Sequence, residues 1–301
     1  MAGADAPRIE PGEAVALVLG TGGARGLAQI GVIEALRARS LNIVAIAGSS
    51  SGALVGALHA ADRLDAFRDW LLGMSRREML LLLDPTFGAP SLLAGRRLMA
   101  ALREIAGDPR IEDLPVDFTA VAVDLMRQRE VWLREGNLWD AVRASIAIPG
   151  VFAPYRIHGR ELVDGGLLAP LPITATRLSD AHRLIAVDMH GWPQRPSGAP
   201  ADPQREDAEV APPRSRLSRW FARQLSGPAS KASPFGFSEL MARSLDTMQA
   251  QIARVQLALD PPELVIRIPR DVCQFYEFWR ARELIDIGRA QADRALDAAG
   301  Y

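Results

Sequence analysis

The sequence has few of the residues on which disulfide-rich and metal-binding proteins depend. It contains one cysteine, Cys273, and four histidines in 301 residues. One cysteine cannot form an internal disulfide, and no group of cysteines and histidines has the spacing of metal ligands. We therefore expect a fold that needs neither a disulfide nor zinc, and we expect no metal and no cofactor.

An excess of positive charge is also lacking. The chain has 35 Lys and Arg against 36 Asp and Glu, which gives a net charge of −1, and Lys231 is its only lysine. A surface that binds nucleic acid needs clustered cations that acidic neighbours do not neutralise. We therefore expect no nucleic acid as a partner.

The sequence shows no apolar leader and no convincing membrane span. Residues 1–13 carry four charged side chains and no apolar stretch, so we expect no secretory signal and a cytoplasmic location. Residues 41–61 carry no charge and approach the ~20 residues of a membrane span. Asn42 and three consecutive serines make this a poor span. We expect no transmembrane segment.

Composition divides the chain into four parts. A hydrophobic content of 49% with 24% charged residues is typical of a globular protein. Residues 1–13 are predicted to be a tail and residues 14–191 the core. Residues 192–236 are rich in proline, serine and charge, which predicts a flexible insertion. Residues 237–301 are predicted to pack on the core as helices and one strand.

The C-terminal part has a strand pattern at residues 263–268 and a helix pattern at residues 272–299. Before them, apolar residues recur every three or four positions, as on one face of a long helix. These residues are Phe237, Leu240, Met241, Leu245, Met248, Ile252, Val255 and Leu259. We expect this apolar face to dock on the core; transient contact with a membrane surface is the alternative.

Residues 43–56 predict a buried strand, a tight turn and a helix, with the pattern Gly48-x-Ser50-x-Gly52 at the turn. A serine at such a turn has a strained backbone and leaves no room for side chains two residues away, which favours glycine there. The free N–H groups of the helix N-terminus favour negative charge beside its hydroxyl. Ser50 is therefore a candidate nucleophile, although this stretch also suits a plain flexible turn.

A glycine-rich turn follows the first predicted strand. The apolar residues 14–20 predict a strand that is covered on both faces, and residues 21–26 read Thr-Gly-Gly-Ala-Arg-Gly before a buried helix. Such a turn can present backbone N–H groups to an anion. A dinucleotide is disfavoured, because Arg25 stands where its fingerprint needs glycine. The oxyanion of acyl transfer is the other candidate, with Gly22 and Gly23 as donors beside Ser50.

A third pattern ends in Asp164-Gly165-Gly166. Residues 155–157 and 161–163 predict a hairpin that leads to this aspartate. An aspartate before two glycines can form an Asx-turn, or it can direct its carboxylate into a cleft. The residues alone leave both roles open.

In this order the three patterns resemble the patatin-like phospholipase family. Residues 19–26, Leu-Gly-Thr-Gly-Gly-Ala-Arg-Gly, resemble its glycine-rich oxyanion motif, residues 48–52 its serine turn, and residues 164–166 its Asp-Gly-Gly motif. Residues 144–154 are similar to the segment before that aspartate. The resemblance covers residues 14–190. Thr21 departs from the motif, which usually has glycine at that position.

The resemblance implies an α/β fold, a three-layer α/β/α sandwich with a mainly parallel central sheet. It implies a serine acyl hydrolase, a lipolytic esterase of the phospholipase A or lysophospholipase type, with an acyl ester as substrate and a location that is cytoplasmic or peripheral to a membrane. Ser50 would be the nucleophile and Asp164 the general base, without histidine. The other implied residues are the oxyanion-hole positions Gly22, Gly23, Ala24 and Arg25 and the motif glycines Gly26, Gly48, Gly52, Gly165 and Gly166.

Two alternatives remain. In an α/β-hydrolase triad, Asp164 or Asp188 would be the acid and His190 the base, but Ser50 follows the second predicted strand, earlier than that fold places its nucleophile. In the other alternative, the chain keeps the fold without catalysis and binds a partner through residues 192–236.

Overall fold

The computed structural model describes residues 9–10, 12–82, 84, 93–177, 179–181, 183–193 and 237–301. The chain divides into two compact units, residues 1–194 with 248–301, here called the core unit, and residues 195–247. Of the second unit, the described residues 237–247 are helical. The predicted insertion, residues 192–236, lies outside the described residues except for its first two positions.

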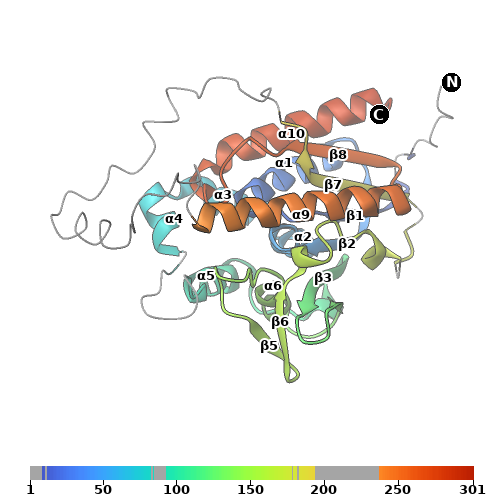
Figure 1. The fold of residues 1–301 in the computed structure, drawn as a ribbon. Helices are drawn as coiled ribbons and strands as arrows, with labels where there is room; N and C mark the ends of the chain where they lie inside the picture. The colour runs from blue at the N-terminus through green and yellow to red at the C-terminus, as the bar shows by residue number, and fades with distance from the viewer. Residues whose placement is uncertain are drawn as a thin grey trace, which may run out of the picture. The chain divides into compact units, whose positions relative to one another are not determined.

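The core unit is built on a mixed sheet (Figure 1). The described strands are β1 (Ala14–Leu19), β2 (Asn42–Ser49), β3 (Asp117–Asp124), β4 (Arg129–Leu133), β5 (Tyr155–Ile157), β6 (Arg160–Asp164), β7 (Arg183–Gly191) and β8 (Leu264–Pro269). Their order is β5-β6-β3-β2-β1-β7-β8, with β4 also paired to β3. Strands β3, β2, β1, β7 and β8 run parallel, and the β4, β5 and β6 pairings are antiparallel.

α-Helices cover the two faces of this sheet, together with the segment after β6 that contains the 3-10 helices η3 (Gly165–Leu167) and η4 (Ile173–Thr176). The described α-helices are α1 (Ala28–Ala38), α2 (Ser51–Ala60), α3 (Leu64–Gly73), α4 (Arg76–Leu82), α5 (Arg96–Ala106), α6 (Leu138–Ser145), α9 (Phe237–Leu259) and α10 (Ala281–Ala298). Neighbouring residues of β1 face opposite sides, as in any strand. Leu17 and Leu19 join the core that includes α1, α2 and α10, whereas Val18 packs with Ile173 and with Ala253 of α9. The predicted α/β sandwich with a mainly parallel sheet is confirmed.

The part of α9 that belongs to the core unit, residues 248–259, packs through a different face from the one predicted. Ala250 and Ala253 are buried, whereas Met248, Val255 and Leu259 are 54%, 46% and 79% exposed. The prediction that these larger side chains would dock on the core is therefore wrong. Alanine allows a helix backbone to come closer to the sheet than methionine or leucine would, and Ala253 here packs in a cluster with Val18, Leu171 and Ile173.

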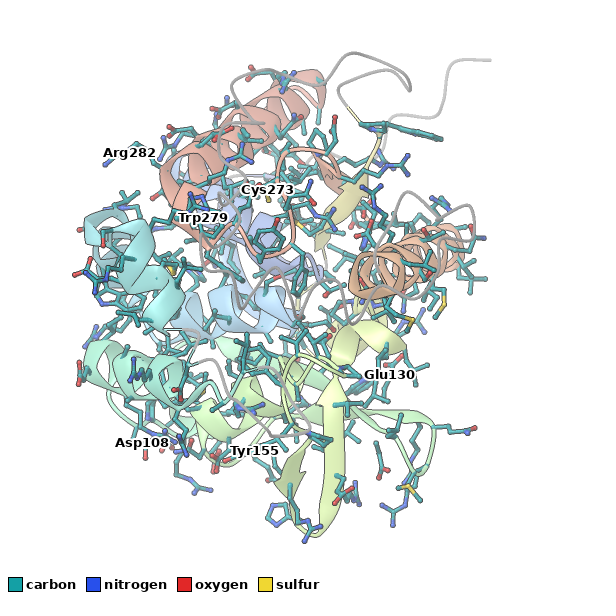
Figure 2. All side chains as sticks on the ribbon, turned by 60° about the vertical axis from the view of Figure 1, so that its left-hand side comes forward. Asp108, Glu130, Tyr155, Cys273, Trp279 and Arg282 are labelled. Atoms are coloured by element: carbon teal, nitrogen blue, oxygen red, sulfur yellow. The ribbon has the colours of Figure 1, made fainter. Side chains whose placement is uncertain are left out.

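Residues 272–277 form a loop, and a short 3-10 helix (Phe278–Arg280) then leads into α10, although a helix was predicted from residue 272. Helix α10 begins at Ala281, and Cys273 and Trp279, labelled in Figure 2, lie in the segment that precedes it. The Phe275 carbonyl accepts a hydrogen bond of 2.9 Å from the Ala24 N–H in the glycine-rich turn. Within a helix that carbonyl would bond to a later residue of the same helix. Contact with the distant turn therefore takes precedence over the local helix pattern.

Helices α1 and α10 lie side by side and touch through their backbones (Figure 1). A Cβ at Gly31 would stand 2.0 Å from the Ile285 carbonyl oxygen, and one at Gly288 would stand 1.8 Å from the Ala28 carbonyl oxygen. Only glycine fits at either position. Because Ala28 begins α1 directly after the glycine-rich turn, this crossing also supports that turn.

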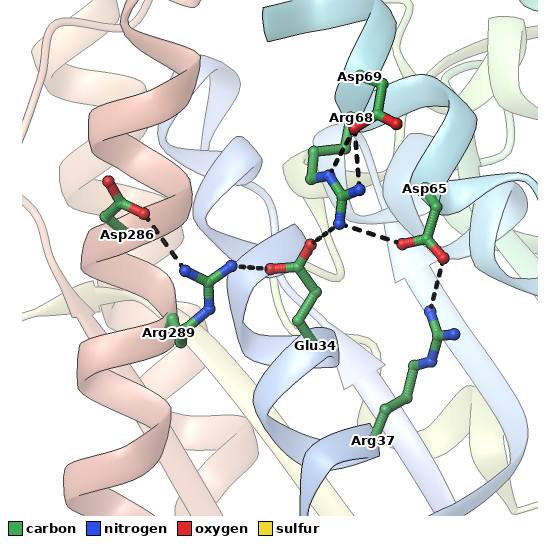
Figure 3. A network of polar contacts seen from close by, with 7 residues as sticks. All are labelled: Glu34, Arg37, Asp65, Arg68, Asp69, Asp286 and Arg289. Carbon is green, nitrogen blue, oxygen red and sulfur yellow. Dashed lines mark hydrogen bonds and ion pairs between the residues drawn. The ribbon is translucent and has the colours of Figure 1, made fainter.

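Charged side chains link the outer surfaces of three helices (Figure 3). Glu34 of α1 accepts a hydrogen bond of 2.7 Å from Arg68 of α3 and another from Arg289 of α10. Arg68 and Arg289 also pair with aspartates on their own helices. Glu34 is mostly buried, so this network is less screened by solvent than an isolated surface pair.

The α1–α10 crossing gives a stability prediction. We expect Gly288→Ala to lower the free energy of unfolding by about 3 kcal/mol, because the new methyl group overlaps the α1 backbone. Gly73→Ala is the matched control: it lies at the end of α3, where an added Cβ would have no atom within 4 Å, and we expect it to stabilise by about 0.5 kcal/mol. Urea denaturation of both variants measures the difference; equal stabilities would contradict the crossing.

Candidate active site

The sheet brings the end of β2 to the end of β6. Ser49 pairs with Val121 of β3, and Asp164 pairs with the next residue, Ala122. Strand β2 runs parallel to β3, β6 runs antiparallel to it, and both use the edge of β3 that β4 leaves open. The two strands therefore end head to head, which places Ser50 and Asp164 together although they are far apart in the sequence.

Ser50 occupies the strained turn between β2 and α2. Its backbone has φ 55° and ψ −123°, a left-handed conformation that is uncommon outside glycine. The Ser50 N–H donates to Ser145 Oγ at 3.0 Å, and that hydroxyl donates to the Val121 carbonyl at 2.6 Å. Ser145 is fully buried and thus connects the strained turn to β3.

The two glycines of this turn are required by close backbone contacts. A Cβ at Gly48 would stand 2.5 Å from backbone atoms of Gly52, and one at Gly52 would stand 2.1 Å from the Leu19 carbonyl oxygen. The Gly52 contact holds the start of α2 against the end of β1. The serine turn and the glycine-rich turn that follows β1 are therefore neighbours.

The Asp164 carboxyl is buried beside Ser50 and is held by the backbone that follows it. Its Oδ1 accepts a hydrogen bond of 2.7 Å from the Gly166 N–H. The Ser50 hydroxyl is near enough to favour the charged carboxylate, yet within the described part of the chain the buried Oδ2 has no partner with full hydrogen-bond geometry. The contact between the Ser50 hydroxyl and the Asp164 carboxyl is therefore longer or less well aligned than a full hydrogen bond in this structure.

Burial changes the acidity of this aspartate. It raises the pKa of Asp164 from 3.8 to about 7, against the smaller opposing effects of hydrogen bonds from Ser50 and the Gly166 N–H. A carboxyl with this pKa can both accept and release a proton near neutral pH. Its acidity is thus suited to general acid–base chemistry.

The glycine-rich turn presents one unoccupied N–H group. Of the four predicted oxyanion-hole residues, three have N–H groups that already donate: Gly22 to Ser51 Oγ at 3.1 Å, Ala24 to the Phe275 carbonyl, and Arg25 to the Gly22 carbonyl at 3.2 Å. Among the described residues, the Gly23 N–H has no acceptor. Of these four N–H groups, the Gly23 N–H is therefore the one that could bind an anion without breaking another bond in the described structure.

Gly23 must be glycine for two reasons. Its φ is +56°, and a Cβ there would stand 2.3 Å from the ring of Phe275. The contacts of the Arg25 side chain do not favour a role in binding an anion. The side chain is buried, and its Nη1 donates to the Arg270 carbonyl at 2.8 Å. Arg25 and Phe275 thus attach the turn to the C-terminal segment.

The remaining motif glycines also stand at close contacts. A Cβ at Gly26 would lie 2.2 Å from the side chain of Ser51, and one at Gly165 would lie 2.1 Å from the Val121 carbonyl oxygen. The Ser51 and Ser145 contacts were not predicted from the sequence. Both residues lie inside motif segments, at residues 48–52 and 144–154, and that position was the only available signal.

His190 lies on β7, which pairs with β1 and not with β2. Two strand spacings of about 4.8 Å therefore separate β7 from the strand that leads to Ser50. The His190 N–H donates to Asp188 Oδ1 at 2.9 Å, and its Nδ1 lies 3.6 Å from the same oxygen. This geometry does not support a triad that joins His190 to Ser50.

The described residues contain no group of three or more potential metal-binding side chains that could hold an ion. Nor does any helix in the described part of the chain combine the length and apolar character needed to cross a membrane.

Comparison with known proteins agrees with the motifs. The family model described as patatin-like phospholipase matches residues 17–177. An uncharacterized NTE family protein of Mycobacterium tuberculosis (strain H37Rv) is 40% identical over 98% of this chain and 93% of its own length. Lysophospholipase nte1 of Aspergillus oryzae is 29% identical over 95% of this chain, which corresponds to 18% of that protein.

A mouse protein, patatin-like phospholipase domain-containing protein 7, is 35% identical over 60% of this chain and 14% of its own length. The crystal structure of VipD from Legionella pneumophila aligns with a TM-score of 0.46 at 14% identity, over 96% of this chain and 67% of VipD. The family match covers more than half of the chain, and the mycobacterial match covers nearly all of it. This chain belongs to the patatin-like phospholipase family.

Proposed function

We propose that this protein is a serine acyl hydrolase that cleaves lipid esters through an acyl-enzyme on Ser50, with Asp164 as the general base. One observation carries the proposal. Ser50, in a strained turn, directly follows β2, the buried Asp164 is the last residue of β6, and these two strands meet on the same edge of β3. Family membership makes a lipid ester the substrate class, and a relative named as a lysophospholipase favours the phospholipase A or lysophospholipase type.

The reaction divides into two halves. In the first, Asp164 accepts the Ser50 hydroxyl proton while Oγ attacks the ester carbonyl, and the bond to the alcohol then breaks as Asp164 returns the proton to the leaving oxygen. In the second, Asp164 takes a proton from water, whose oxygen attacks the acyl-enzyme, and Ser50 regains a proton as the fatty acid leaves. Both halves pass through an oxyanion, for which the Gly23 N–H is the open donor and Gly22 the adjacent one.

The acidity of Asp164 makes this dyad workable without histidine. An aspartate with its reference pKa near ~3.9 is a weak base at neutral pH. With a pKa of about 7, half of the Asp164 carboxyls are ionised at pH 7, and the ionised form is a stronger base.

The choice between a dyad and a triad can be tested at His190. We expect His190→Ala to keep kcat/KM for an acyl ester within about tenfold of the wild type, because loss of an essential base typically costs ~10²–10⁴-fold. Circular dichroism would show that the variant is folded. Abolished activity in folded His190→Ala protein would contradict the dyad and favour the triad.

A fluorophosphonate probe tests the enzyme against a non-catalytic family member. Such a probe reacts covalently with activated serines, so we expect labelling at Ser50. A folded protein whose Ser50 resists the probe would contradict the proposed function.

A further inference from the structure

Three polar groups from separate parts of the core unit converge beside Gly166. A methyl group at position 166 would stand 2.8 Å from Gln249 Nε2, 2.8 Å from Thr21 Oγ1 and 2.9 Å from Asp164 Oδ1. Thr21 follows β1, and Gln249 is a residue of α9. The turn after β1 and the C-terminal helix therefore both place a polar side chain next to the general base.

The hydrogen-bonding capacity of the two new groups is unused. Within the described residues, neither the Thr21 hydroxyl nor the Gln249 side-chain amide forms a hydrogen bond, although Thr21 is buried and Gln249 is partly buried. Among the described residues, neither the Thr21 hydroxyl nor the Gln249 amide belongs to the fully enclosed side-chain groups that lack a partner, so both remain accessible to a polar group that arrives with a ligand. Thr21 is also the position at which this chain departs from the glycine that is usual in the family motif.

The position of these groups relative to Asp164 indicates which half of the ester they meet. In the proposed mechanism the proton that Asp164 takes from Ser50 goes to the leaving alcohol oxygen. The alcohol half of the ester must therefore lie on the Asp164 side of Ser50. Thr21 and Gln249 approach Asp164 on the side of Gly166 and Oδ1, beside the carboxyl that would protonate the alcohol, whereas the acyl chain stays bound to Ser50 after the alcohol leaves.

The chemistry of the two side chains favours an uncharged partner. A hydroxyl and a carboxamide each offer both a donor and an acceptor, which suits an alcohol O–H. No charged side chain of the described residues contributes to the pKa shift of Asp164. A phosphate at this point would therefore lie next to the ionised carboxylate without a neighbouring cation.

We propose that Thr21 and Gln249 form a subsite for a free hydroxyl group in the alcohol half of the ester, as found in glyceryl esters. This inference rests on the proposed function and adds to it a preference for hydroxylated alcohols. Neither residue takes part in the covalent steps.

The test uses two substrates that share one fatty acid: a monoacylglycerol and the corresponding propyl ester, which lacks the hydroxyls. We expect the wild-type protein to prefer the glyceryl ester. Gln249→Met and Thr21→Val remove the polar groups and keep the side-chain size. Each substitution should lower kcat/KM for the glyceryl ester by ~10-fold and keep kcat/KM for the propyl ester within about twofold of the wild type. The reason is that the glyceryl ester loses a hydrogen-bond partner for its hydroxyl, whereas the propyl ester has no hydroxyl to lose one.

Two controls match these variants. Gln251→Met makes the same substitution at an exposed position of α9 and should change neither rate. Thr21→Ser keeps a hydroxyl and should retain the preference for the glyceryl ester. If Thr21→Val does not fold, Gln249→Met alone decides, since its partly exposed side chain is not a core contact.

Equal losses on both esters, or no loss on either, would overturn the hydroxyl subsite while leaving the hydrolase intact. If the wild-type protein hydrolyses neither ester, and fluorophosphonate does not label Ser50, then the proposed function fails and the subsite fails with it.

Discussion

Replacing Ser50 with alanine should lower the rate of acyl-ester hydrolysis by about 10⁴-fold or more and should leave the fold intact. The loss is large because the hydroxyl forms the covalent bond, and no other group in the site can replace it. The fold should survive because the bond from the residue 50 N–H to Ser145 Oγ and the sheet register do not involve the Ser50 side chain. Initial rates on a soluble ester, with a far-ultraviolet spectrum, measure both effects.

Ser49→Ala is the matched control for Ser50→Ala. The Ser49 hydroxyl is buried one residue earlier and has no hydrogen-bond partner among the residues that the structure describes, so its removal breaks no bond there. We expect Ser49→Ala to keep activity and fluorophosphonate labelling, and Ser50→Ala to lose both. Comparable activity in the two variants would rule out Ser50 as the nucleophile.

Replacing Asp164 with asparagine should have opposite effects on activity and stability at alkaline pH. Activity should fall by ~10²–10⁴-fold, because asparagine cannot accept the Ser50 proton. Stability should rise, since ionising a carboxyl whose pKa is about 7 in the folded protein and near ~3.9 in the unfolded chain costs roughly 4 kcal/mol of folding free energy. The gain at pH 8 should approach that value.

The pH dependence of this difference follows from the direction of the pKa shift. The folded protein holds the Asp164 proton up to about pH 7, whereas the unfolded chain releases it near pH 4. The wild-type protein therefore loses stability as pH rises from about 4 to 7, and the variant does not. The difference between the Asp164→Asn variant and the wild type in the free energy of unfolding, measured with urea, should be small at pH 4. It should increase between pH 4 and pH 7 and stay constant above pH 7. In the wild type, kcat/KM should rise with pH around an apparent pKa of about 7.

Asp188→Asn is a control that should change stability in the opposite direction from Asp164→Asn. Burial alone would raise the pKa of Asp188, but hydrogen bonds from His190 and the charge of Arg267 outweigh it and lower the pKa. Asparagine should therefore destabilise the protein at pH 8 at this position. If Asp164→Asn is also destabilising at pH 8, or if kcat/KM does not change between pH 5 and 9, burial does not control the acidity of Asp164.

Local sequence determined the elements and the turns of this protein. The apolar residues 14–19 and 43–47 form buried strands, and the glycines around Ser50 permit its left-handed turn. The predicted hairpin that leads to Asp164 is present and turns at His158 and Gly159. These features depend on steric limits and burial patterns within a few residues, so they can be predicted without knowing the partners of a segment.

Only the tertiary structure decided which groups meet. The encounter of Ser50 with Asp164 depends on the register of two strands on β3, and the acidity of Asp164 depends on how completely the surrounding chain excludes water. The loop before α10 and the alanine face of α9 follow from contacts with residues more than 60 positions away, which outweigh the local helix pattern and the apolar stripe. Such contacts are set by the packing of the whole core unit, and a local sequence pattern contains no record of them.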